Sequence, residues 1–283
     1  MPWREVTIFL AVTFGGITLV GLLWAGLGDM NDQRDALVFG GLGMLTPTLG
    51  AIAATRLTGA YRGPARFLLD TGVTPSPPWG RLVRYLAVGL LLPLVIMAAA
   101  LCIGSLAGVY RFVRPFPLDS LLAGLGTNLV TFVPLLVLML GEELGWGYLL
   151  PRLLPLGLWP GLLASGTIWG LFHAPLTLQG YLFPTLPGVV GTLVFTLGSV
   201  LLAVLMGWLR LASANLWPAV VLHGSSNLLA NPIPPTIGQA TDPATANLAT
   251  SLPGGWPSWV AMAVIIAGLA ATGRYRRHYR PQS

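Results

Sequence analysis

Long runs of apolar residues, almost free of charge, limit the possible folds of this chain more than any other feature. Eight such segments are present, at residues 7–27, 36–57, 85–109, 122–150, 158–178, 186–209, 215–230 and 256–273. A membrane-spanning helix needs roughly 20 predominantly apolar residues. Most of the segments reach this length, and the seventh is the shortest. The sequence therefore predicts an all-α fold, a polytopic membrane helix bundle with about eight transmembrane helices.

Composition excludes the other broad classes. Only 8% of the 283 residues are charged, whereas soluble globular chains carry about 25%. Disorder requires low hydrophobicity and high net charge, but 54% of this chain is apolar. Cys102 is the only cysteine, which excludes an internal disulfide framework and a multi-cysteine metal site. We expect a single transmembrane domain over residues 1–283.

The basic residues, fifteen arginines and no lysine, indicate the orientation of the bundle. With eight spans, both termini and twelve arginines lie on one side, and Arg34, Arg111 and Arg114 lie on the other. Cytoplasmic loops are rich in Lys and Arg, so we expect both termini to be cytoplasmic, in a bacterial or archaeal membrane. The basic tail at 274–280 is expected to bind anionic lipid headgroups rather than nucleic acid.

Strongly polar side chains interrupt three of the apolar segments. They are Glu142, Glu143, His173, His223 and Asn227. An ionised group inside a span costs several kcal/mol, at least about 2.5–3.5 on insertion scales, so such groups usually serve a function. Counted along helices, all of them reach the cytoplasmic half of the bilayer or its midplane. We expect them to meet in one conical pocket that opens toward the cytoplasm or the lipid.

Spacing predicts which of these side chains share a face. His223 and Asn227 are four residues apart, as are Trp169 and His173, so each pair lies on one side of a helix. Glu142 and Glu143 differ by about 100° around a helix. Only one glutamate can therefore point straight into the pocket, and we expect the other to pair with a neighbour and orient the site.

This set of groups is suited to hydrolysis. A glutamate can take a proton from water while a histidine holds that water, and a histidine with an asparagine amide can stabilise an oxyanion. Glu142, His173 and His223 also form a possible zinc set. The nearby Asn227 favours the reaction without a metal, because two donors on one helical face suit an oxyanion, but both schemes stay open. Ser225 and Ser226 lack a buried acid to complete a triad.

Two readings without hydrolysis compete with this one. The polar groups can form a hydrogen-bonded network that only holds helices together. They can also form a proton or ion relay, because transporters use chains of Asp, Glu and His. Transporters usually carry broken helices in both halves of the chain, whereas here the polar groups are confined to the fourth, fifth and seventh segments.

The same residues resemble the CPBP family of intramembrane proteases, which includes CAAX prenyl endopeptidases and bacteriocin-processing or immunity (Abi-type) proteins. The family pattern is Glu-Glu-x-x-x-Arg, then Phe-x-x-x-His, then His-x-x-x-Asn on successive helices. Here these motifs begin at Glu142, Trp169 and His223. The resemblance covers residues 122–230, which form the expected catalytic core.

This resemblance implies a role for each polar residue. Glu142 would activate the hydrolytic water with His173, and His223 with Asn227 would form the oxyanion site. Glu143 would support them. The implied substrate is a peptide or a membrane-associated protein, prenylated in the CAAX enzymes.

Two positions depart from the family pattern. Trp169 replaces a phenylalanine, and Gly147 stands at the position of the arginine. Without that arginine, either one glutamate is protonated or Arg152 reaches back to the pair. The departure also leaves a third function open, a catalytically impaired binding or immunity protein. The sequence does not predict the oligomeric state.

Overall fold

The structure is a computed structural model that describes residues 2–30, 32–75, 77–277 and 279, with backbone alone at residue 33. His278 and Arg280 of the basic tail lie outside these residues. The expected all-α fold is confirmed, because each of the eight apolar segments is helical. The main helices are α1 (Trp3–Leu27), α2 (Gln33–Leu57), α4 (Trp79–Leu106), α5 (Leu118–Leu153), α6 (Leu158–Phe172), α8 (Gly188–Ser213), α9 (Trp217–Ser225) and α12 (Trp256–Ala271).

Length divides these helices into two groups. Within the described part of the chain, α1, α2, α4, α5 and α8 are long and apolar enough to cross a membrane, and α12 is a shorter apolar helix. The remaining segments, 158–178 and 215–230, are interrupted. The apolar stretch of the first is divided between α6 and the short α7 (Ala174–Thr177), and that of the second between α9 and a π-helical turn at Ser226–Ala230.

Proline explains the interruption after α6. Pro175 has no backbone N–H and cannot continue the hydrogen-bond ladder of the preceding turn. The helix therefore ends at Phe172, and His173 caps it with its N–H bonded to the carbonyl of Gly170. His173 thus lies at a helix end, where its side chain is not constrained by a continuing helix.

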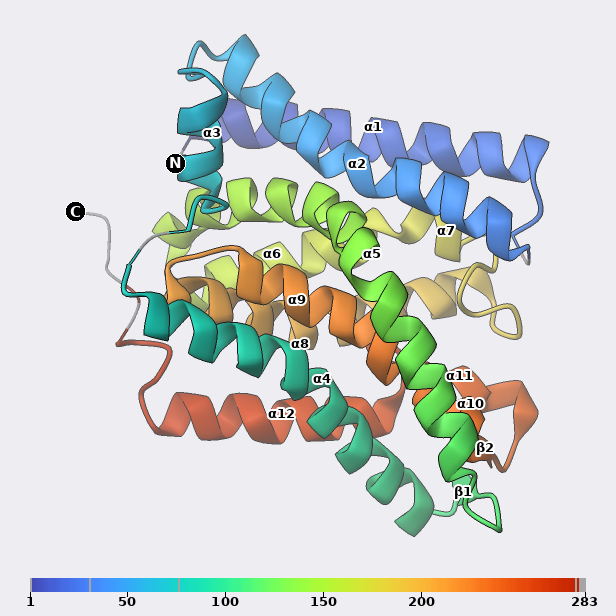
Figure 1. Ribbon diagram of the computed structural model, residues 1–283. Helices are drawn as coiled ribbons and strands as arrows, with labels where there is room; N and C mark the ends of the chain where they lie inside the picture. The colour runs from blue at the N-terminus through green and yellow to red at the C-terminus, as the bar shows by residue number, and fades with distance from the viewer. Residues whose placement is uncertain (1, 31, 76, 278, 280–283) are drawn as a thin grey trace.

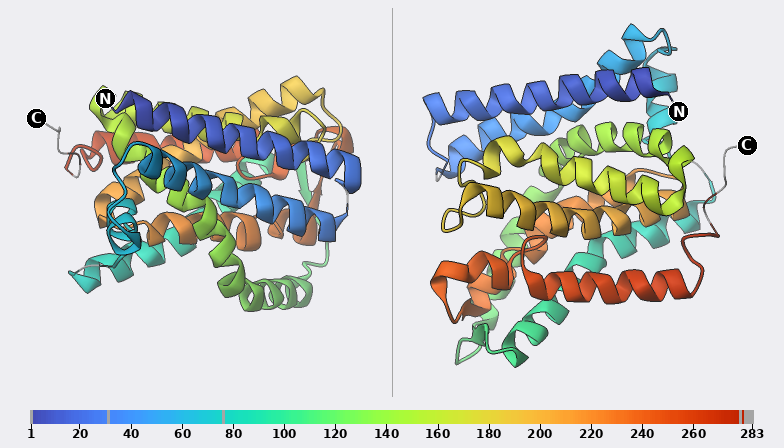
Figure 2. Two further views of the ribbon diagram at one scale, coloured as in Figure 1. Left: turned by 90° about the horizontal axis from the view of Figure 1, so that it is seen from above. Right: turned by 180° about the vertical axis from the view of Figure 1, so that it is seen from behind.

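The helices run back and forth along one common direction (Figure 1). The start of α1 and the end of α12 lie at the same end of the bundle, as an even number of crossings requires. The opposite end holds α7, α10 (Ile233–Ile237), α11 (Ala246–Thr250) and the strands β1 (Tyr110–Phe112) and β2 (Gly238–Ala240). Seen from behind, α8 lies between α6 and α12 (Figure 2).

Two close helix contacts position the polar residues. A Cβ at Gly166 would lie 2.7 Å from the Val200 Cα, and a Cβ at Gly170 would clash with Thr196, so α6 packs against α8 through its glycine face. Small residues at this spacing are typical of membrane helix pairs. Similarly, Pro47 of α2 lies so close to Gly145 of α5 that no side chain would fit at this position.

Helix α5 turns midway along its length (Figure 1). Pro134 lies within this helix, and an internal proline removes a backbone hydrogen bond and bends the helix. The N-terminal half of α5 therefore leans away from the bundle, while the half that carries Glu142 and Glu143 stays in its interior.

The segment 231–255 contains short regular elements. The chain forms α10, β2, a 3₁₀ turn and α11 there. Strand β2 pairs antiparallel with β1, with Arg111 opposite Gln239. Five-residue helices and a three-residue strand are too short to produce a clear periodic signal, which is why the sequence did not reveal them.

Arg152 anchors α5 to α1. Its Nε donates to Glu5 Oε2 over 2.6 Å, the Tyr148 hydroxyl donates to the same oxygen over 2.7 Å, and the guanidinium lies 3.4 Å from the Tyr148 ring centre. One of the alternatives for the missing family arginine is therefore wrong, because Arg152 bonds with Glu5 and not with the glutamate pair.

Substituting Glu5→Gln should weaken the attachment of α1. The charged partner of Arg152 is lost while the side-chain shape is kept, and hydrogen bonds to charged groups contribute about 1.5–3 kcal/mol. We expect the midpoint of thermal unfolding in lipid nanodiscs to fall. In a double-mutant cycle with Arg152→Gln, the two substitutions should be less than additive; full additivity would contradict the ion pair.

Arginine distribution predicts that the end holding α10 and α11 faces away from the cytoplasm. Exposed positions 244 and 74 lie in segments at opposite ends of the bundle. In a Cys102→Ala background, Ala244→Cys should react with a membrane-impermeant maleimide in intact cells. Thr74→Cys should react only after the membrane is opened. The reverse pattern would contradict this orientation.

Candidate active site

The Glu142 carboxylate is buried and held by two indoles. Its side chain is only 1% exposed. Oε1 accepts hydrogen bonds from Trp146 Nε1 at 3.0 Å and from Trp169 Nε1 at 2.6 Å. Trp146 is one turn further along α5, whereas Trp169 belongs to α6. Oε2 has no protein donor among the described residues, so one carboxylate oxygen is fixed and the other is left for chemistry.

Glu143 points in a different direction and bonds with a histidine. Its Oε1 lies 2.9 Å from His223 Nδ1 of α9, and both side chains are buried. The two neighbouring glutamates therefore have different partners, which agrees with the 100° rotation between consecutive helical residues. An ionised carboxylate only accepts hydrogen bonds, so opposite an ionised Glu143 it is His223 Nδ1 that donates.

His173 is oriented by the end of α6 and by aromatic rings. Its Nδ1 lies 3.0 Å from the carbonyl oxygen of Trp169, one turn earlier. A carbonyl can only accept, so Nδ1 donates and Nε2 is turned the other way. The imidazole packs against Phe195 of α8, with ring centres 4.5 Å apart.

Asn227 belongs to the π-helical turn that follows α9. The sequence analysis placed it four residues after His223 on a regular helix, but the chain widens there, and π turns occur frequently at functional sites. Its Nδ2 lies 3.8 Å from Met139 Sδ, a weak contact that leaves the amide available to another acceptor.

Four of the expected site residues line one cavity of about 410 Å³: Glu142, His173, His223 and Asn227. They come from α5, the end of α6, α9 and the π turn. Glu143 does not line this cavity and reaches it only through His223. The arrangement therefore contains a carboxylate, two imidazoles and an amide around one space, with a second carboxylate behind them.

The cavity extends toward the end of the bundle that lies away from the termini. Its walls include Leu37 at the start of α2, Tyr181 and Leu182 after α7, and Pro253 before α12, all at that end (Figure 1). The sequence predicts cytoplasmic termini and a pocket open toward the cytoplasm or the lipid; a cavity that extends toward this end leads away from the side of the termini. Glu142 lies about 16 Å from the end of α5 at Leu153, close to the middle of the bundle.

The position of the family arginine is filled by neighbouring atoms. A Cβ at Gly147 would lie 2.9 Å from Leu216 Cδ1 and 3.0 Å from the Thr71 carbonyl oxygen. An arginine there would have to displace both. The side chain that faces Glu143 is instead that of His223.

Sequence reasoning missed Trp146 as a partner of Glu142. Its position four residues later was the available signal, because such residues are neighbours on a helix. The nearby serines are used for packing: Ser225 Oγ bonds to the Leu90 carbonyl at 2.6 Å and Ser226 Oγ to the Leu222 carbonyl at 2.9 Å.

The described residues do not fit a metal ion. No three His, Cys, Asp or Glu side chains among them are placed to hold one. The Nδ1 contacts of His173 and His223, to a carbonyl and a carboxylate, are of the kind that orients metal-ligating histidines. However, Glu142, His173 and His223 do not form a group of three that could hold a metal ion. We therefore derive no reaction step through zinc.

One comparison with known proteins gives a match, to a family model that covers part of the chain. Residues 124–229 match the family described as Rce1-like, type II CAAX prenyl endopeptidase Rce1-like. The matched region contains all five polar residues and ends just after Asn227. Searches of curated proteins and of solved structures found no match. Residues 124–229 are thus similar to the Rce1-like type II CAAX prenyl endopeptidases, which supports the resemblance to the CPBP family over this part of the chain.

Proposed function

We propose that the protein is an intramembrane endopeptidase that hydrolyses a peptide bond with a water activated by Glu142. The observation that carries this proposal is the convergence of Glu142, His173, His223 and Asn227 on one cavity inside an apolar bundle. A network that only holds helices together would not need a cavity, nor a carboxylate oxygen without a protein donor.

Glu142 and His173 hold the attacking water. The two indole donors stabilise negative charge on the carboxylate and fix its orientation. Oε2 takes a proton from the water, while His173 Nε2 accepts the second O–H. The oxygen then attacks the carbonyl carbon of the scissile peptide bond.

His223 and Asn227 stabilise the oxyanion that this attack creates. In the proposed mechanism His223 acts in its doubly protonated form, in which Nδ1 donates to the Glu143 carboxylate at 2.9 Å. In that form Nε2 carries a proton and can donate it in a hydrogen bond. The amide of Asn227 supplies a second donor, as in other oxyanion sites.

Collapse of the tetrahedral intermediate completes the reaction. Glu142 returns the proton to the departing nitrogen, the C–N bond breaks, and the products are a carboxylic acid and an amine. One water molecule is consumed, and Glu142 regains its charge.

The substrate is a segment of a peptide or a membrane protein that enters the cavity as an extended chain. The volume of about 410 Å³ accommodates a few residues and excludes a folded domain. The matched family also suggests prenylated proteins as substrates.

Glu142→Gln should abolish cleavage, because an amide cannot take the proton from water. We expect at least a 100-fold loss of rate, the usual contribution of a general base. Glu143→Gln keeps a hydrogen-bond acceptor for His223 but removes the negative charge of the glutamate. We therefore expect a smaller loss of cleavage rate, about 10- to 100-fold, as for other residues that orient catalytic groups. Quantitative proteomics of membrane proteins, in cells that carry each variant, measures both effects on the cleaved products.

This comparison contains its own control, since both variants are adjacent, buried and nearly isosteric with the native residue. Equal activity in wild type and Glu142→Gln would contradict the proposal. Ion-coupled uptake into liposomes that disappears in Glu142→Gln, with no cleaved protein, would favour a transporter.

Asn227→Ala should slow cleavage by about 100-fold, because it removes one oxyanion donor. The metal content of the purified protein should not change in this variant, and activity should survive exhaustive chelation. Stoichiometric zinc, lost together with activity in His223→Ala, would instead establish the metal-dependent scheme.

A further inference from the structure

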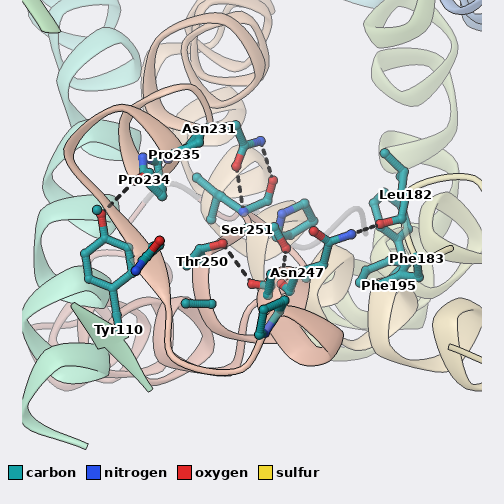
Figure 3. A pocket seen from close by; sticks show the side chains of 18 residues that line it. Tyr110, Leu182, Phe183, Phe195, Asn231, Pro234, Pro235, Asn247, Thr250 and Ser251 are labelled. Atoms are coloured by element: carbon teal, nitrogen blue, oxygen red, sulfur yellow. Dashed lines mark hydrogen bonds between the residues drawn. The ribbon is translucent and has the colours of Figure 1, made fainter. Parts of the chain in front are cut away.

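A second, larger cavity lies at the end of the bundle away from the termini. It measures about 710 Å³ and is enclosed by Tyr110 of β1, by β2, α10 and α11, and by the chain after α7 (Figure 3). We call it the outer cavity. None of the residues assigned to hydrolysis lines it, so the proposed mechanism does not use it.

The outer cavity adjoins the one that holds Glu142. The two share five lining residues: Leu182, Phe195, Asn231, Leu252 and Pro253. Phe195 contacts the His173 ring on one side, at 4.5 Å between ring centres, and the Phe183 ring on the other, at 6.4 Å. A single layer of side chains therefore separates the outer cavity from the imidazole of His173.

The lining of the outer cavity carries no charge. It contains no Asp, Glu, Lys, Arg or His among the described residues. Tyr110 is its one titratable group; burial raises the pKa of Tyr110 to about 12, and its hydroxyl donates to the Pro234 carbonyl at 2.7 Å. The walls stay neutral at physiological pH, so they favour an uncharged occupant.

One edge of β2 provides backbone hydrogen-bonding groups in this cavity. The bonds Val113 N–H to Ile237 O and Thr241 N–H to Val109 O fix the register with β1. Bonded and non-bonded pairs alternate in an antiparallel ribbon, so the N–H and C=O of Ala240 point away from β1. The ribbon has two strands, and Ala240 lines the cavity.

The walls are held in place by bonds between loops. The Asn231 amide donates to the Leu252 carbonyl and accepts from the Leu252 N–H, each at 2.7 Å. Asn247 donates to the Leu182 carbonyl, and Thr185 Oγ1 donates to the Ala244 carbonyl at 2.7 Å. Figure 3 shows the first of these bonds and the Asn247 contact at the cavity wall. The outer cavity is thus preformed rather than created by a ligand.

We propose that the outer cavity is a vestibule that binds an uncharged, extended segment of the substrate beside the scissile bond, with its backbone paired to the edge of β2. This assignment rests on the proposed protease function, from which it takes the peptide as ligand. Addition of a peptide strand to an exposed sheet edge is a common recognition mode, and Phe195 places the next residues of that peptide beside His173.

Two variants test this vestibule, each with a matched control. Ala240→Pro removes the N–H on the edge of β2 that points away from β1, without removing a bond to β1, and Ala240→Ser keeps that N–H. Ala246→Glu introduces a charge into the wall at the start of α11, whereas Ala246→Gln has nearly the same shape without charge. Unfolding midpoints of all four variants show whether the fold is kept.

Binding is measured by fluorescence anisotropy on the full chain in nanodiscs. The probe is a dye-labelled, blocked hexapeptide of alternating alanine and valine, and every protein carries Glu142→Gln, so binding is separated from cleavage. We expect Ala240→Pro and Ala246→Glu to weaken binding at least tenfold, and the two controls to stay within about twofold of the parent protein.

Absence of probe binding, or equal binding by all folded variants, would overturn the vestibule. If one test variant fails to fold, the other pair decides the outcome. The protease proposal is tested separately, by measuring cleavage of substrate by protein that has an intact Glu142. Binding with the predicted pattern, but without cleavage by that protein, would leave the vestibule in place and refute the protease.

Discussion

Burial of an ionisable carboxylate in the middle of an apolar bundle is the constraint on which the site depends. Glu142 is tolerated there because the indoles of Trp146 and Trp169 both donate to one of its oxygens. This arrangement requires α5 and α6 to be close, and the glycine face of α6 brings that helix against α8. The helix packing and the burial of the carboxylate therefore depend on each other, because the Trp169 donor is lost if α6 moves away and only Trp146 of α5 remains.

Much of the fold and of the site follows from local sequence rules. The lengths of the apolar runs predicted the eight helical segments, because a helix is one of the few structures that satisfy all backbone hydrogen bonds inside a membrane. The rotation of about 100° per helical residue predicted that Glu142 and Glu143 point in different directions and that one of them pairs with a neighbour. In the structure this neighbour is His223, which pairs with Glu143. These predictions succeeded because they depend on geometry within one helix.

Features that depend on contacts between distant segments were not predictable. The sequence could not show that Arg152 bonds with Glu5, nor that β1 pairs with β2 across more than a hundred residues. How far the cavity extends along the bundle depends on where α5 bends and where the loops after α7 lie, which depth counted along single helices does not predict. With arginines directing the termini to the cytoplasm, both cavities would face the other side of the membrane.

The central claim is that Glu142 activates water and does not itself attack the peptide bond. A single turnover in ¹⁸O-labelled water tests it most directly, with a cleaved membrane protein identified by proteomics as substrate. Direct attack by water predicts one ¹⁸O atom in the new carboxyl group of the product and none in the protein. A first-turnover product without ¹⁸O, together with ¹⁸O in the Glu142 carboxylate, would show that the glutamate is the nucleophile and would contradict this account.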